Sequence, residues 1–128
     1  MHDLMFDNND PLLARVRAIA LAFPESQEKV SHGRPAFFTG KVFAYFGGAL
    51  KADGEWVQHP QSLVILSDLA EREALRQRPG TYAPAYLGVS GWTGVDLSSD
   101  SDWEEVAELI EDSFRMTAPT RLVRRLGG

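Results

Sequence analysis

The sequence predicts an α+β protein in which helices pack on one face of an antiparallel β-sheet. Three observations predict this class. An amphipathic helical pattern begins the chain, short segments rich in aromatic and β-branched residues fill the middle, and a second amphipathic pattern lies near the end. The resulting order of helix, strands, helix, strands and helix does not show the regular strand–helix alternation of a parallel sheet.

The length and composition are those of one globular domain. The 128 residues are 44% hydrophobic and 24% charged, which is ordinary for a domain with its own core. We expect a flexible N-terminus over residues 1–9 and a single α+β domain over residues 10–128. The chain has no cysteine, which excludes a disulfide framework, a thiolate metal site and a cysteine nucleophile.

The N-terminal residues and the hydropathy pattern bear on location. The first ten residues carry three aspartates and lack the cationic and apolar regions of a secretory signal. No apolar run approaches the length of a membrane span. We therefore expect a cytoplasmic protein with no membrane partner.

The first helix is expected to begin at Asp10-Pro11, because an oxygen-bearing residue caps a helix and proline suits its first position. Pro24 is expected to end it. The apolar residues between them recur at helical spacing and predict one buried face: Leu12, Leu13, Val16, Ile19, Ala20 and Phe23.

The middle of the chain predicts antiparallel strands. Residues 36–39 and 42–46 flank Gly40-Lys41, which favours a short hairpin. We expect Gly47-Gly48 to end the second of these strands. Further extended segments are expected at residues 56–57, 63–66, 84–87 and 92–97.

Two further helices carry clear start signals. Asp68 caps the second helix, which Pro79-Gly80 closes. Ser101 and Glu104 have the spacing of a capping box at the start of the third. Its expected apolar face consists of Trp103, Val106, Ala107, Ile110 and Phe114.

The third helix also has an acidic face. Glu104, Glu108 and Asp112 follow one another at four-residue steps, so they could bind a hard cation or simply face water. Solvation is favoured, because carboxylates at this spacing repel one another. Pairing with a short tail helix is a further possibility, since that helix starts at Pro119 and presents Arg121, Arg124 and Arg125 on one face.

No catalytic, metal-binding or cofactor motif stands out. Neither His32 nor His59 has a second ligand at the helical spacing of a zinc motif. No nucleophile elbow, phosphate-binding loop or dinucleotide fingerprint is present. We therefore assign no catalytic residue, no metal ligand and no cofactor, and we expect a protein that is not an enzyme.

The net charge of −5 conceals a strong division along the chain. Residues 29–52 hold four cations and no acid, whereas residues 96–112 hold eight acids and no cation. Aromatic residues interleave with the cations, which is the composition of a nucleic-acid-binding surface. The simpler interpretation is that these aromatics form core and that the lysines keep strand edges soluble.

Several segments together resemble the MmcQ/YjbR family. They are residues 29–38, 40–44, 84–88, 91–97 and 109–115, the last with Phe114 where the family has tyrosine. The resemblance implies a CyaY-like, or frataxin-like, fold of the double-wing type and, because members are described as DNA-binding, a DNA partner. Iron binding does not follow, because the acids here lie on the third helix and the first helix carries none.

The leading hypothesis from the sequence is a non-enzymatic DNA-binding protein. In it Arg34, Lys41 and Lys51 contact phosphates, while Tyr86 and Trp92 approach the groove or stack on bases. The full candidate set for nucleic-acid binding is Lys29, His32, Arg34, Lys41, Lys51, Tyr86 and Trp92.

The alternative hypothesis is a protein-interaction or small-ligand-binding module. Trp92, Tyr86 and Trp56 lie beside glycine-rich turns in the sequence, so they could line an aromatic pocket.

Overall fold

The computed structural model describes residues 4–127. Its helices are α1 (Pro11–Ala20), α2 (Leu69–Arg76), the 3₁₀ turn η1 (Gly88–Ser90), α3 (Trp103–Thr117) and α4 (Thr120–Arg124). Its strands are β1 (Gln27–Ser31), β2 (Arg34–Phe38), β3 (Val42–Ala52), β4 (Glu55–Leu66), β5 (Thr81–Tyr82) and β6 (Trp92–Asp96).

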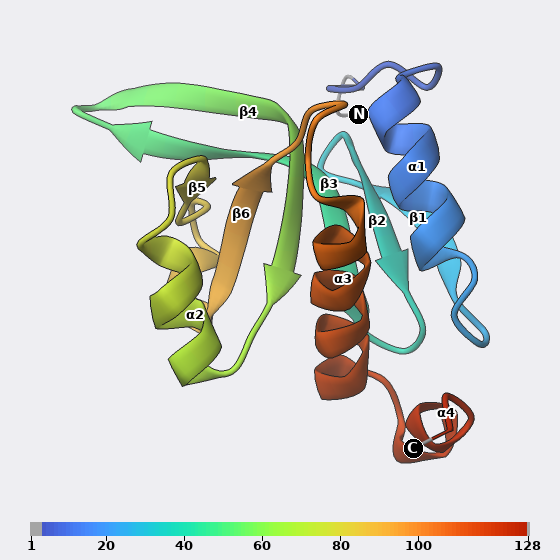
Figure 1. Ribbon diagram of the computed structural model, residues 1–128. Helices are drawn as coiled ribbons and strands as arrows, with labels where there is room; N and C mark the ends of the chain where they lie inside the picture. The colour runs from blue at the N-terminus through green and yellow to red at the C-terminus, as the bar shows by residue number, and fades with distance from the viewer. Residues whose placement is uncertain (1–3, 128) are drawn as a thin grey trace.

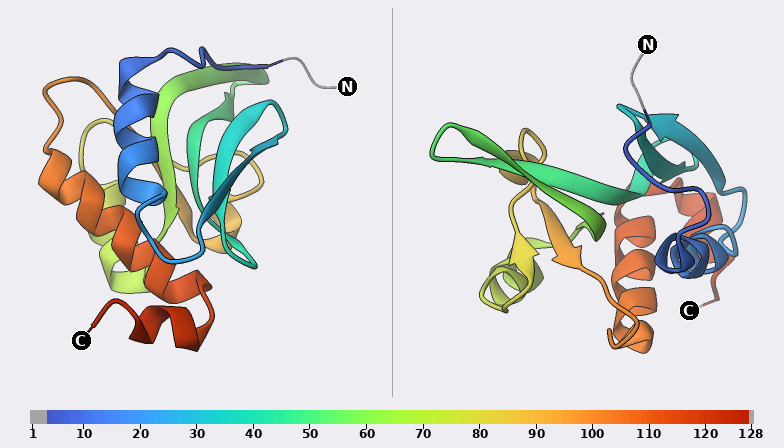
Figure 2. Two further views of the ribbon diagram at one scale, coloured as in Figure 1. Left: turned by 90° about the vertical axis from the view of Figure 1, so that its right-hand side faces the viewer. Right: turned by 90° about the horizontal axis from the view of Figure 1, so that it is seen from above.

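The strands form a six-stranded antiparallel sheet in the order β1-β2-β3-β4-β6-β5. Helices α1, α2 and α3 cover one face of it, as the view from above shows (Figures 1 and 2). The predicted α+β class, with helices on one face, is therefore confirmed. The CyaY-like type that the sequence resemblance implies stays a prediction.

The core lies between the sheet and α1 and α3. The ring of Phe114 on α3 stacks on Phe23 at 4.8 Å between centroids and meets Phe43 of β3 edge-on at 5.1 Å. Ser113 adds a polar link, because its Oγ donates to the carbonyl oxygen of Phe43 (2.6 Å) and accepts from the amide of Leu66 (3.0 Å). Helix α3 is thereby fixed to both central strands.

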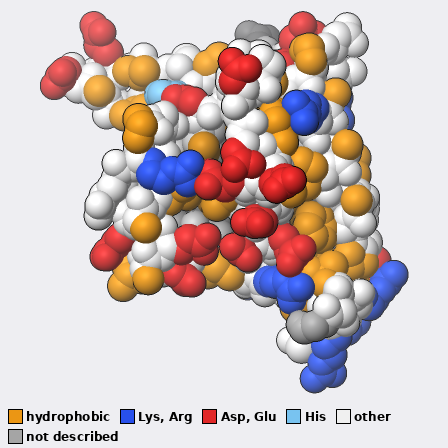
Figure 3. Space-filling view, in the orientation of Figure 1, with side chains coloured by type: hydrophobic (Ala, Val, Ile, Leu, Met, Phe, Trp, Pro, Cys, Tyr) orange, Lys and Arg blue, Asp and Glu red, His pale blue; other side chains and the backbone are white. Residues whose placement is uncertain are grey.

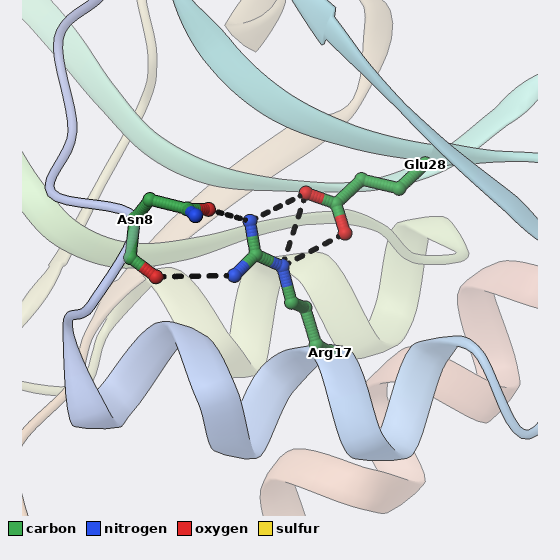
Figure 4. Close-up of polar contacts among 3 residues, drawn as sticks. All are labelled: Asn8, Arg17 and Glu28. Carbon is green, nitrogen blue, oxygen red and sulfur yellow. Dashed lines mark hydrogen bonds and ion pairs between the residues drawn. The ribbon is translucent and has the colours of Figure 1, made fainter.

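Helix α1 is anchored at its start and through Arg17. The side chain of Asp10 accepts from the amide of Leu12 (2.8 Å), which is the predicted N-cap. Arg17 bonds Glu28 of β1 through Nε (2.8 Å) and Nη2 (2.9 Å), and Nη2 also reaches Asn8 (2.6 Å), as Figure 4 shows. This bidentate pair ties α1 to the edge strand.

The segment before α1 is the predicted flexible N-terminus, residues 1–9. Residues 1–3 lie outside the described part of the chain. Within residues 4–9, the Met5 amide donates to the carbonyl oxygen of Gly33 (2.8 Å), and Phe6 packs against the core.

The central hairpin is longer than the sequence indicates, and the expectation that Gly47-Gly48 would end its first strand is wrong. β3 continues to Ala52 through a shift of register between Phe46 and Gly48, and β4 pairs with it along its length. Gly47 has φ +89°, a conformation that glycine adopts easily, so the strand can shift its register here and still pair with β4 beyond it. Strand β1 was not expected, because its sequence, QEKVS, lacks an apolar alternation.

Two local predictions fail at turns and caps. Residues 84–87 form a turn instead of an extended strand, because Tyr86 adopts φ +67° and the chain turns into η1. Helix α3 is capped one residue later than expected: Asp102 accepts from the amide of Glu105 (3.2 Å), while the Ser101 hydroxyl accepts from the amide of Ser98 (2.9 Å).

The acidic side chains of α2 and α3 gather on the helix-covered face of the molecule (Figure 3). Burial, together with the carboxylates of Asp112 and Asp68, raises the pKa of Glu71 between these helices. Arg121 and Arg125 of the tail instead bind Glu25, with contacts of 2.7 Å and 3.4 Å. These two tail arginines therefore pair with Glu25 and not with the acids of α3, which was one possibility from the sequence.

We predict that Gly94→Ala destabilises the fold. A Cβ at Gly94 of β6 would overlap the ring of Tyr82, which lies across this position. Overpacking of this kind costs about 1–3 kcal/mol, measurable by urea denaturation. Gly40→Ala is the matched control, because nothing lies within 4 Å of its Cβ position.

A double-mutant cycle identifies the cause. The Tyr82→Ala variant has no ring at this position, so in that background Gly94→Ala should lower the free energy of unfolding much less. An equal cost in both backgrounds would show that the ring is not the reason.

Candidate ligand-binding site

The face of the sheet opposite α1 and α3 holds a pocket of about 550 Å³. Strand alternation places it there: Leu63 and Ile65 of β4 belong to the core beneath the helices, whereas Val64 between them lines the pocket. The lining comes from β1–β4 and the turn before η1, and consists of Ser31, His32, Arg34, Tyr45, Gly47, Gly48, Ala49, Trp56, Val64, Pro84, Ala85, Tyr86 and Leu87.

Arg34 is the charged group of this pocket. Arg34 is the first residue of β2, and it is only 9% exposed. Nη2 donates to Oε1 of Gln58, while the buried Nη1 has no hydrogen-bond partner among the described residues. Burial lowers the pKa of Arg34, since the charged guanidinium is held away from water.

Gly47 makes room for the Arg34 guanidinium. A Cβ built at Gly47 would lie 2.5 Å from Nη1 of Arg34 and 3.1 Å from the carbonyl oxygen of Pro60. The positive φ of Gly47 also disfavours any other residue. The irregularity in β3 therefore admits a buried cation beside the pocket.

Aromatic rings form the rim. Tyr86 is 84% exposed and Trp56 is 49% exposed, and their ring centroids lie 6.3 Å apart. The turn that carries Tyr86 is fixed to the hairpin, because the amide of Ala85 donates to the carbonyl oxygen of Ala49 (2.8 Å). Figure 2 shows this segment on the side of the sheet away from the helices.

Two lining residues have a backbone in the left-handed region, His32 (φ +52°) and Tyr86 (φ +67°). His32 and Gly33 form the two-residue turn between the paired residues Ser31 and Arg34, where both φ values are positive as that hairpin turn requires. Tyr86 is not in such a hairpin turn, and a left-handed non-glycine residue costs about 1–3 kcal/mol. The turn before η1 therefore holds Tyr86 at the pocket in a strained conformation.

A second aromatic pair lies beside the pocket. Tyr45 lines it, and Trp92 of β6 contacts Tyr45 edge-on at 5.5 Å between centroids. Burial raises the pKa of Tyr45, so its phenol is held in the neutral form.

The candidate residues named from the sequence fall into three groups. His32, Arg34 and Tyr86 line the pocket together. Lys51 and Trp92 lie next to it: the Lys51 ammonium is 5.8 Å from the ring centroid of Trp56, and Trp92 packs on Tyr45.

The remaining two candidates lie elsewhere. Lys29 on edge strand β1 lies over the ring of Phe38 at 4.7 Å, and Lys41 is in the turn that precedes β3. Lys41 directly precedes β3, and Lys51 is the last residue but one of this long strand. At about 3.3 Å per residue, their backbones are separated by at most roughly 30 Å. The cations of the basic segment therefore do not all converge on the pocket.

Sequence reasoning missed three contributors: Tyr45, Gly47 and Gln58. The sequence pattern predicts that Gly47 ends a strand, although a glycine pair within an aromatic run also signals a bulge or a close approach of chains. Nothing in the local sequence distinguishes Tyr45 from a core aromatic or links Gln58 to Arg34.

A polar network adjoins the pocket at Gly48. The Tyr82 hydroxyl contacts Oγ of Ser62 (2.7 Å), and its ring stacks on His59 at 4.0 Å. Nδ1 of His59 lies 2.7 Å from Oδ1 of Asp96. Desolvation raises the pKa of Tyr82 to about 12, while the Ser62 hydrogen bond acts in the opposite direction.

Over residues 4–127, no group of three or more His, Asp or Glu side chains is placed to hold a metal ion. Within the same range, no helix combines the length and apolar character needed to cross a membrane.

The model of the family described as YjbR matches residues 21–116. The chain belongs to the YjbR family. The MmcQ/YjbR resemblance seen in the sequence is therefore confirmed.

A solved structure supports the fold of this YjbR-family chain. The crystal structure of Deinococcus radiodurans protein DR2400, described with a DUF419 domain, matches with a TM-score of 0.61 and 17% identity. The match covers 90% of this chain and 87% of that one, and at this identity it supports the fold alone. No curated protein matches the chain.

We predict that Tyr82 ionises at about pH 12, followed by near-ultraviolet absorbance, and that Tyr82→Phe removes this titration step. Ser62→Ala should raise the pKa further, because the Ser62 hydrogen bond lowers it. The free energy of unfolding should fall as pH rises from about 10 to about 12, because the unfolded state loses this proton first. Titration of Tyr82 at its ordinary pKa of 10 would contradict the burial described above.

Proposed function

We propose that this chain is a binding protein whose pocket holds a small molecule with a flat ring. One observation carries the proposal: a pocket of about 550 Å³ contains a buried guanidinium and is bordered by exposed rings of Tyr86 and Trp56. Its volume is in the range of small-molecule sites, which are typically about 300–1,000 Å³. The two ring planes are tilted by 43° to each other, and a planar group can stack on the exposed face of either ring.

Binding is the role that these groups support, rather than catalysis. A guanidinium and aromatic rings hold and orient a ligand without forming or breaking bonds in it. The sequence ranked DNA binding above a small-ligand site. The geometry favours the reverse order, because Arg34 is buried in a pocket and Lys41 lies at the far end of β3 from Lys51.

We predict that an uncharged planar probe, such as indole, quinoline or adenine, shifts the amide NMR signals of the pocket residues. Tyr86→Ala and Trp56→Ala should each weaken binding about tenfold, since a stacked ring contributes about 1–3 kcal/mol. Leu69→Ala is the matched control, because Leu69 is an exposed apolar residue on α2.

Two outcomes would contradict the small-molecule proposal. One is that no probe perturbs the pocket signals. The other is that a probe binds equally well to the Tyr86→Ala, Trp56→Ala and Leu69→Ala variants, because binding would then not depend on the rim.

DNA is the second candidate ligand, and the distribution of charge favours it. The acids of α2 and α3 gather on the helix-covered face (Figure 3), whereas Lys51 lies by the exposed rings of the rim on the other. A single strand could stack a base on Trp56 or Tyr86 while Lys51 contacts its phosphate.

Titrating labelled single-stranded and duplex oligonucleotides tests this candidate. If DNA uses the rim, Lys51→Glu should reduce affinity by about tenfold or more, Lys41→Glu should have little effect, and binding should weaken steeply between about 50 and 200 mM salt. Absence of binding at the lower salt concentration, or equal effects of the two variants, would exclude the rim as a DNA site.

A further inference from the structure

Arg34 is buried but has no carboxylate partner among the described residues. Five other arginines form ion pairs with carboxylates: Arg17 with Glu28, Arg78 with Glu105, Arg115 with Glu111, and both Arg121 and Arg125 with Glu25. Arg34 is the buried arginine among the described residues, yet the acceptor bonded to it is the neutral amide oxygen of Gln58.

An uncompensated buried cation needs an explanation. Burying a charge without a partner is costly, and a buried donor left without an acceptor typically costs about 1–3 kcal/mol or more. Both conditions hold here, since Nη1 has no acceptor within residues 4–127 and no ion pair involves Arg34 there. A structural arginine in a core would be expected to carry a carboxylate partner.

The surroundings of Arg34 favour an external anion. The pocket lining contains no Asp or Glu, so no carboxylate of the lining competes for the guanidinium. The acceptor now on Nη2 belongs to Gln58, whose side chain is on the exposed part of the long hairpin. A charged oxygen bonds a guanidinium more strongly than a neutral amide does, so an entering anion can replace Gln58.

We propose that the pocket ligand carries a carboxylate or phosphate group that displaces the Gln58 side chain and binds both Nη1 and Nη2 of Arg34. This inference rests on the proposed small-molecule function and defines its ligand class. The planar part of the ligand lies against Trp56 and Tyr86 at the rim. The ligand is therefore a small aromatic acid or aryl phosphate, held by its anion at the base of the pocket and by its ring at the mouth.

Matched probes test the charge. Phenylacetate is compared with phenylacetamide, and phenyl phosphate with dimethyl phenyl phosphate, by calorimetry and amide NMR on the full chain. Each anion should bind at least about tenfold more tightly than its neutral counterpart, since a charge-assisted pair adds about 1.5–3 kcal/mol. The stronger of the two anions identifies the carboxylate or the phosphate as the preferred group.

Variants test the residue. Arg34→Gln should abolish the preference for the anion over its neutral counterpart, and Arg34→Lys should retain part of it. Gln58→Ala should leave anion binding unchanged or tighten it, because it removes the competing acceptor. Lys51→Ala is the charge control and should reduce the preference less than Arg34→Gln does.

The outcomes separate the two proposals. Equal binding of anionic and neutral probes at the pocket, or a preference unaffected by Arg34→Gln, would overturn the anion inference and leave the small-molecule function standing. Absence of any probe at the pocket would overturn both. If Arg34→Gln does not fold, the ratio of anion affinity to neutral-probe affinity can still be compared between the wild-type chain and the Arg34→Lys variant, and this comparison tests the anion inference.

Discussion

Strands β3 and β4 pair over most of their length, and this ladder fixes both faces of the molecule. Three successive pairs, Ala44 with Ile65, Tyr45 with Val64 and Phe46 with Leu63, alternate between the helix-covered core and the open face. Because side chains alternate along a strand, packing the first and third pairs beneath α3 directs the middle pair into the pocket. Ser113 reinforces the register by bonding both strands at once.

The pocket depends on one irregularity in that ladder. At Gly47 the register shifts, and the missing side chain leaves the space that the Arg34 guanidinium occupies. A regular strand with a larger residue there would exclude the cation. The same region holds strained backbone at Tyr86, so the regular part of the sheet supports a locally unfavourable arrangement.

Charge follows the same division into two faces. The carboxylates of α2 and α3 lie on the helix-covered side, where they face water or raise the pKa of Glu71 between them. The pocket on the other side is lined by Arg34 and His32 and by no acid. The net charge of −5 therefore says little about the field that a ligand of the pocket would meet.

The sequence by itself determined the local structure of the helices and the family. The Asp10 and Asp68 caps, the apolar face of α3 and the segments shared with the YjbR family depend on residues close together in the chain. It also named His32, Arg34 and Tyr86, which line one pocket in the structure.

Only the tertiary structure decided how those residues are grouped. Whether a basic residue is exposed or buried depends on partners that the ladder brings from elsewhere: Gln58 lies 24 residues from Arg34, and Gly47 comes from the next strand. Lys41 and Lys51, which read as one basic segment, are held apart because an extended strand places its ends far from each other. Pairing across strands, which no local pattern records, turned a supposed basic surface into a pocket with one buried cation.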